Sequence, residues 1–237
     1  MNSEIEEKVY YSQYKQDEFL EKNIFKGFKN GVFVDVGAHD GITLNNTLYF
    51  EKNNGWTGIN IEPIPEIYEK LKINRPNCHN LNYAICKHNG FAQFIQNIGE
   101  TEMLSGLLGS YDTRHAARLY SENQTNGSIS KVIMVPIRTL DYVLSEFKIN
   151  HIHYLSIDTE GAEEDVIKSI NFNRVFIDVI GFENNFSDTS SDIIRYLIRK
   201  NYKYINYSSD STNIEIKDYK PEIFMIHKDS VFMPKSN

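Results

Sequence analysis

Apolar residues along the chain follow two different spacings. Within residues 16–29, Phe19, Ile24 and Phe28 recur at helical spacing and share one face of the expected helix. Residues 32–36 instead form a short run of valine and phenylalanine around one aspartate, which is typical of a strand buried on both faces. The chain therefore begins with a helix that leads into a buried strand.

The same alternation continues to the end of the chain. It predicts further helices at 43–53, near 67–71, and at 140–147, 160–170 and 192–200. It predicts further strands at 57–62, 80–86, 91–98, 132–136, 152–158, 175–180, 203–207 and 222–227. Because strands that alternate with helices form a mostly parallel sheet covered on both faces, we expect a doubly wound, Rossmann-like α/β fold. The last two strands are expected to close the sheet as an antiparallel hairpin.

A single domain spanning residues 1–237 accounts for the length of the chain. An N-terminal helical segment at 1–30 precedes the sheet, and polar residues at about 99–130 are expected to form an irregular insertion over one end of it. Apolar residues make up 41% of the chain and charged residues 24%, which is ordinary for a globular protein with a buried core.

Charge and cysteine content exclude several classes of protein. The net charge of −7 comes without a basic run, which disfavours a nucleic-acid partner because such binding depends on Lys and Arg at phosphates. Cys78 and Cys86 are too few for a disulfide framework or a cysteine-rich zinc site. No secretion signal is visible, and no apolar run approaches the roughly 20 residues of a membrane span. We therefore expect a soluble, cytoplasmic protein.

Ligands of such sheets bind at the carboxyl ends of the strands. This rule selects Asp35–Gly41, Glu62 with Pro63, Asn82–Ala84, Asp158–Gly161 and Glu183.

The segment Asp35–Gly41 contains two glycines, which allow a tight turn and the close approach of a ligand. Its spacing is not the G-x-G-x-x-G of dinucleotide sites, which disfavours an NAD-dependent oxidoreductase. Glu62 ends the next strand, where a carboxylate can accept hydrogen bonds from both hydroxyls of a ribose. Taken separately, the glycine segment is explained by a tight turn and Glu62 by a solvated side chain. Because both occur in this order at the ends of successive strands, they favour a nucleoside-binding site.

The densest acidic cluster lies between residues 158 and 163. Asp158 ends a strand, whereas Glu160 and Glu163 are expected to begin a helix, where the helix dipole favours acidic residues without any further function. Asp158 is the first candidate for a catalytic residue on the acceptor side, followed by Glu160 and then Glu183. A divalent cation shared by these carboxylates is an alternative, because oxygen ligands suit Mg²⁺; the leading interpretation has no metal.

Several motifs, in one order, resemble the FkbM-type methyltransferase family over roughly residues 10–185. They are Ser12-Gln13, Gln16-Asp17, GVFVDVGAHDG at 31–41, Asn46-Thr47, GWTGINIEP at 55–63, Thr139-Leu140-Asp141 and LSIDTEGAEEDVIKSI at 155–170. The resemblance implies a seven-stranded methyltransferase sheet with S-adenosylmethionine as its cofactor. Characterised members mostly methylate oxygen on sugars or natural products.

The resemblance also implies roles for individual residues. Asp35, Gly37 and Gly41 would hold the methionine end of the cofactor with help from Asn46, Glu62 beside Pro63 would bind the ribose, and Asn82–Ala84 would lie by the adenine. His39 stands where many family members carry Asn, which favours a hydrogen-bonding role in the loop over that of a general base.

The leading functional hypothesis is O-methylation of a glycan or another small hydroxylated molecule. Methylation of a nucleic acid or a protein is an alternative, although no N/D-P-P-Y/F motif and no Lys-Asp-Lys-Glu set is found. A third hypothesis is a binding module that has the cofactor-binding fold but no catalytic activity. Tyr111 and His115 in the insertion are candidates to face the substrate, whereas His151 and His153 alternate along a strand and favour a structural role.

Overall fold

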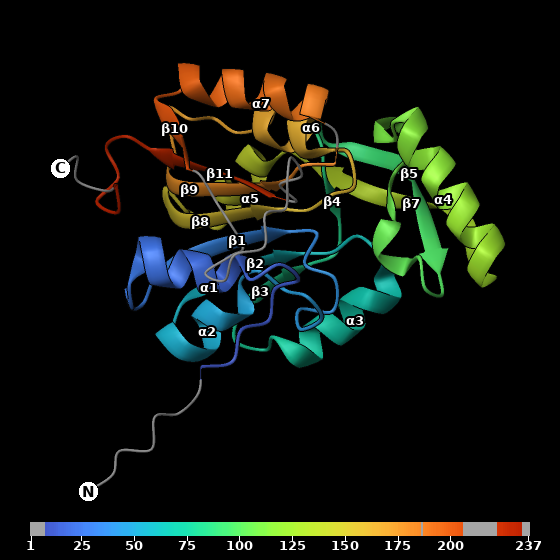
Figure 1. Cartoon of the computed structure of the whole chain (residues 1–237), viewed down its shortest axis with the longest axis horizontal. Helices are drawn as coiled ribbons and strands as arrows, with labels where there is room; N and C mark the ends of the chain where they lie inside the picture. The colour runs from blue at the N-terminus through green and yellow to red at the C-terminus, as the bar shows by residue number, and fades with distance from the viewer. Residues whose placement is uncertain (1–7, 186, 206–221, 234–237) are drawn as a thin grey trace, which may run out of the picture.

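The computed structural model describes residues 8–185, 187–205 and 222–233. Figure 1 shows a central sheet with helices packed around it and a second, smaller sheet with helix α4 at one end. The mostly parallel α/β fold expected from the sequence is confirmed.

The main sheet has seven strands in the order β10-β11-β9-β8-β1-β2-β3. Its strands are β1 (Val32–Val36), β2 (Thr57–Ile61), β3 (His79–Leu81), β8 (His151–Ile157), β9 (Phe176–Glu183), β10 (Tyr202–Ile205) and β11 (Glu222–His227). The first five pair in parallel, whereas β11 runs antiparallel to both β9 and β10. The expected closing hairpin is therefore present, with residues 206 and 207 of its first strand outside the described residues.

The helices are α1 (Gln16–Phe19), continued by the π-helical turn η1 (Leu20–Phe25), then α2 (Leu48–Asn54), α3 (Pro65–Asn74), α4 (Thr113–Asn126), α5 (Leu140–Glu146), α6 (Glu163–Lys168) and α7 (Ser187–Arg199). Helix α2 begins later than the expected residue 43. The reason is that Asp40 accepts the N–H groups of Ile42 and Thr43, and Asn45 those of Thr47 and Leu48. These side chains close turns that compete with a helix.

The second sheet has four strands in the order β4-β7-β5-β6. They are β4 (Ala84–Ile85), β5 (Gly90–Ile98), β6 (Gly106–Leu107) and β7 (Ile129–Arg138), and β5 and β7 form a long antiparallel pair. The single strand expected at 80–86 is therefore wrong, because its two halves, β3 and β4, join different sheets. Short helical turns flank β6 at Glu102–Leu104 (η2) and Leu108–Ser110 (η3).

The expectation that residues 99–130 are irregular is also wrong, because α4 lies within them. Asp112 accepts the N–H of Arg114 at the start of this helix, and Gly127 ends it in a left-handed conformation. Its sequence shows no apolar stripe, since His115 and Leu119 are its buried residues.

Two apolar clusters cover opposite faces of the main sheet. Helices α5, α6 and α7 pack on the face that carries Val34 and Val36, and η1 and α2 pack on the face that carries Phe33. Among the described residues, no helix combines the length and the apolar character needed to cross a bilayer.

Candidate active site

A cavity of about 520 Å³ opens at the carboxyl ends of β1, β2, β8 and β9. Its walls come from all the segments selected by the strand-end rule. The lining residues at the strand ends are Asp35–His39, Thr43–Asn46, Ile61–Ile64, Tyr83–Ile85, Ile157–Glu160, Glu183 and Asn185. Other segments add Gln13, Tyr14 and Gln16 from the N-terminal segment, residues of the insertion between Glu100 and Glu122, and Glu222. A cavity of this size suits a small organic ligand.

The two glycines of the first loop are required by contacts within the protein. Gly37 has φ +88°, and a β-carbon there would lie 1.7 Å from the carbonyl oxygen of Asp158. Gly41 has φ +78°, and its β-carbon would meet side-chain atoms of Leu71 and Arg75 at 2.6 Å. The N–H groups of Gly37 and Ala38 both donate to the carbonyl of Ile61. The two glycines therefore allow close packing within the protein, and the amides of Gly37 and Ala38 hold the loop to β2.

Asp35 is buried and belongs to a hydrogen-bonded network under this loop. Its Oδ2 accepts from Asn45 Nδ2 and Thr47 Oγ1, each at 2.9 Å. Burial raises its pKa, and the nearby Arg75 guanidinium opposes that shift. Asp35 still lines the cavity, but its described contacts stabilise the loop.

Arg75 is a site-forming residue that the sequence analysis missed. Its side chain is fully buried, and its guanidinium donates to Gly41 O at 3.1 Å, Asn45 Oδ1 at 3.0 Å and Thr47 Oγ1 at 3.2 Å. Its Nε pairs with Glu51. A buried guanidinium whose donors are satisfied in this way fixes the loop from below.

Glu62 is buried with its carboxylate at the cavity wall. Its two oxygens accept the N–H groups of His39, at 3.1 Å, and of Ile64, at 2.8 Å. Burial raises the pKa of Glu62 to about 7, and the charge of Glu102 adds to the shift. A third partner on this carboxylate, such as a ribose hydroxyl, would stabilise its ionised form.

The residues expected near the adenine divide into two kinds. Asn82 donates to the carbonyls of Glu62 and Pro63, at 2.9 and 3.1 Å, and so braces the turn behind the cavity. Pro63, Ala84 and Ile85 line the cavity, and Ile64 and Phe94 add apolar surface beside them. This part of the wall suits a flat apolar group such as a base.

Asn46 lines the cavity and keeps one unused acceptor. Its Nδ2 donates to Ser156 Oγ at 3.2 Å, whereas its buried Oδ1 has no hydrogen-bond partner. An amide oxygen of this kind is an acceptor for a ligand donor.

The acidic cluster lines the same cavity as Glu62. Oxygen atoms of Asp158, Glu160 and Glu183 all lie within 4.8 Å of one another. The expectation that Glu160 begins a helix is wrong, because Glu160 has φ +54° and α6 begins at Glu163. Glu163 Oε1 instead accepts from both N–H and hydroxyl of Thr159 and from the N–H of Gly161. Glu163 therefore closes the loop that presents the other carboxylates.

The pKa values in this cluster are raised. The Asp158 side chain is exposed to the cavity, but desolvation by the surrounding protein, with the charges of Glu163 and Asp35, raises its pKa to about 7. Burial and neighbouring carboxylates raise the pKa values of Glu160 and Glu183 well above their usual range. Asn185 Nδ2 donates to Glu183 at 2.6 Å. Near neutral pH the cluster therefore shares protons and contains a group suited to accept one more.

The insertion supplies the remaining wall. His115 is buried, with Nδ1 3.4 Å from Glu160 Oε2, and the Tyr111 hydroxyl donates to the carbonyl of Leu104. Neither residue is part of the cavity wall, whereas Arg118, one turn along α4 from His115, is. Arg118 carries a positive charge near the acidic cluster, and it opposes the raised pKa of Glu160.

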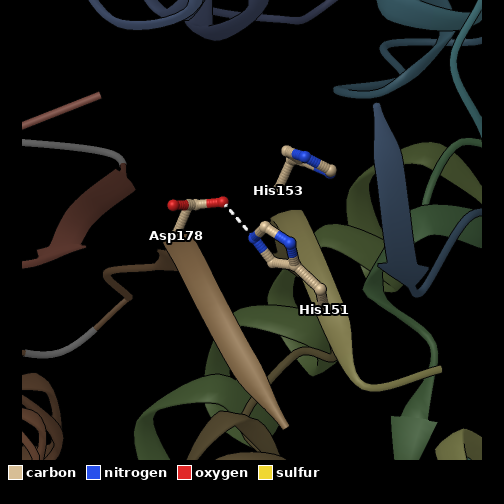
Figure 2. A group of neighbouring side chains, drawn as sticks. All are labelled: His151, His153 and Asp178. Carbon is tan, nitrogen blue, oxygen red and sulfur yellow. Dashed lines mark hydrogen bonds and ion pairs between the residues drawn. The ribbon is translucent and has the colours of Figure 1, made fainter. Parts of the chain in front are cut away.

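A second polar cluster, shown in Figure 2, lies at the opposite end of β8. His151 Nε2 is 2.6 Å from Asp178 Oδ2, and the Ser230 hydroxyl donates to Asp178 Oδ1 at 2.5 Å. His153 Nδ1 accepts the backbone N–H of Val32 at 2.9 Å, so the proton of the neutral ring is on Nε2. That ring has no lone pair left for a metal while this bond holds, and the cluster is structural.

The fold places this cavity at the strand ends, where doubly wound α/β proteins bind their ligands. Residues 35–204 match the methyltransferase FkbM domain, and the chain belongs to this family. No curated protein matches the chain in sequence.

Solved structures with a related fold are distant in sequence. Methyltransferase FkbM from Methylobacillus flagellatus KT is 11% identical, with a TM-score of 0.49 over 84% of this chain; the match spans 44% of that chain. Precorrin-6y C5,15-methyltransferase from Geobacter metallireducens GS-15 is 10% identical, with a TM-score of 0.47 over 94% of this chain and 91% of its own. A TehB-like SAM-dependent methyltransferase from Corynebacterium glutamicum is 10% identical, with a TM-score of 0.46 over 92% of this chain and 89% of its own.

Proposed function

We propose that the protein methylates a hydroxyl oxygen of a glycan or another small molecule, with S-adenosylmethionine as methyl donor. The observation that carries this proposal is one cavity with two kinds of lining, which we call its cofactor half and its acceptor half. One half has Glu62 at its wall beside an apolar lining, and the other has Asp158, with a pKa raised to about 7, between Glu160 and Glu183.

The residues of the first half fit the cofactor. Glu62 would accept the ribose hydroxyls, Ile64, Ala84 and Ile85 would enclose the adenine, and Asn46 Oδ1 would accept from the methionine ammonium group. When bound, S-adenosylmethionine supplies an electrophilic methyl group on a sulfonium.

The residues of the second half would act on the acceptor. Asp158 would accept the proton of the acceptor hydroxyl as that oxygen attacks the methyl carbon. A base whose pKa lies near the working pH suits this transfer, which typically contributes about 10²–10⁴-fold to the rate. Orientation of the hydroxyl toward the methyl carbon, by Glu160 and Glu183, would contribute a further part of the barrier.

The charge of this half limits the class of acceptor. Several carboxylates face the space next to Asp158, and Arg118 is the cation nearest to them among the described lining residues. A phosphate-rich acceptor such as a nucleic acid would find a single Arg side chain to pair with among these lining residues, whereas the hydroxyls of a sugar can hydrogen-bond with carboxyl groups in either protonation state. The proposed proton transfer needs these carboxylates alone and no divalent cation.

The test is to follow release of S-adenosylhomocysteine from the whole chain against neutral sugars, phosphorylated sugars, nucleotides, lipids, RNA, DNA and protein. We expect turnover with a neutral hydroxylated acceptor and no dependence on Mg²⁺ or on a chelator. Asp158→Asn serves as the matched inactive control. Turnover confined to nucleic acid or protein would overturn the proposed acceptor class.

A further inference from the structure

The insertion forms the cover of the cofactor half of the cavity. Glu102, Met103, Leu104, Ser105 and Leu107 all line the cavity, on the side that also holds Glu62 and the glycine loop. The insertion therefore limits how a ligand in this half can enter and leave.

This part of the insertion is held rigidly by the second sheet. Strand β6 pairs with Phe94 and Ile95 of β5. Asn97 Nδ2 donates to the Leu104 carbonyl at 2.8 Å, and the Ser105 hydroxyl donates to the Glu102 carbonyl at 2.5 Å. Glu102 consequently projects from a fixed turn.

Glu102 reaches the glycine loop through His39. The distance from His39 Nε2 to Glu102 Oε1 is 3.0 Å, and both side chains are partly buried. The backbone N–H of His39, which lies in the glycine loop, donates to Glu62 Oε2 at the end of β2. His39 has φ +50°, a conformation that costs energy for a non-glycine residue and persists where surrounding contacts hold it. One residue thus connects the insertion to the proposed ribose-binding carboxylate.

We propose that His39 and Glu102 form a latch, which holds the insertion over the bound cofactor and slows its release. The inference rests on the proposed binding of the cofactor beside Glu62. Because the insertion is tied to the second sheet, breaking the latch should let the insertion and that sheet shift together away from the glycine loop without unfolding either sheet. The effect should therefore appear mainly in the dissociation rate.

The test measures dissociation of S-adenosylhomocysteine from the whole chain by stopped flow, with affinity by calorimetry. His39→Asn shortens the side chain beyond the reach of Glu102, and Asn tolerates the left-handed backbone. We expect His39→Asn and Glu102→Ala each to raise the dissociation rate roughly fivefold, the scale of a partly exposed ion pair. The double variant should release no faster than either single variant, because both remove one contact.

Glu69→Ala is the matched control, since it breaks an exposed ion pair with Lys72 and Glu69 is not among the residues that line the cavity. Its dissociation rate should equal that of the wild type. Unchanged rates in both latch variants, or additive effects in the double variant, would overturn the latch while leaving cofactor binding intact. A wild-type chain that does not bind S-adenosylhomocysteine would instead contradict the proposed function.

Discussion

The Cα of Gly37 packs against the backbone carbonyl of Asp158 so closely that a β-carbon at Gly37 would lie 1.7 Å from that oxygen. The contact joins the ends of β1 and β8, which are neighbours in the sheet. It therefore holds the start of the glycine loop against the backbone of Asp158, so the two proposed halves of the site adjoin at this point.

Gly37→Ala should destabilise the protein by about 3 kcal/mol or more, because the new methyl group collides with backbone and φ +88° is unfavourable for alanine. Chemical denaturation measures this loss. Gly109→Ala is the control, since a β-carbon there meets no atom within 4 Å. Equal stability of the two variants would mean that β1 and β8 ends can separate without cost.

Glu62→Ala should weaken binding of S-adenosylhomocysteine by about 1–3 kcal/mol, the cost of lost ribose hydrogen bonds. It also leaves the N–H groups of His39 and Ile64 unpaired, so some loss of stability is expected. Glu62→Gln keeps one carbonyl acceptor and separates the two effects. Calorimetry and thermal unfolding on both variants provide the comparison; an unchanged dissociation constant would remove Glu62 from the ribose site.

Stability should fall as pH rises from about 5 toward 8. Burial raises the pKa of Glu222 to about 8, so the folded protein holds this proton more tightly than the unfolded chain. The stabilisation is complete below the ordinary pKa of a glutamate, about 4.5, and is lost as pH rises through 8. Glu222→Gln should flatten this decline in the free energy of unfolding, whereas exposed Glu69→Gln should not. A decline of equal slope in Glu222→Gln would contradict the assignment.

Asp158→Asn should lower turnover by about 10²-fold or more, the scale of a lost general base, and leave cofactor affinity nearly unchanged. Single-turnover methyl transfer and calorimetry on the same variant distinguish the roles. A fall in affinity together with rate would place Asp158 on the cofactor. Full rate with full affinity would transfer the catalytic role to Glu160 or Glu183.

The central strands of the main sheet, such as β1, β8 and β9, could be predicted because they are nearly continuous apolar runs, whereas β3 (His79-Asn80-Leu81) is not and was placed wrongly. The strand-end rule then selected Glu62, Asp158 and Glu183 correctly as residues of one cavity. The prediction failed for α4, where just two residues of the helix are buried and no apolar stripe marks it.

Contacts between residues far apart in the sequence could not be predicted, because they produce no local sequence pattern. Arg75 lies 34 positions from the carbonyl of Gly41 that it fixes, and Glu102 lies 63 positions from His39. Neither spacing has a periodic signature, so the loop network and the His39–Glu102 contact are visible in the folded chain alone. The role of Glu163 is likewise set by a loop conformation, through the left-handed Glu160 and Gly161.

The central claim is tested most directly by calorimetric titration of the whole chain with S-adenosylmethionine and S-adenosylhomocysteine, with NAD as the comparison. The account predicts saturable binding of both sulfur nucleosides, weakened in Glu62→Ala, and no heat of binding with NAD. Absence of binding heat with either sulfur nucleoside at millimolar concentration would contradict it.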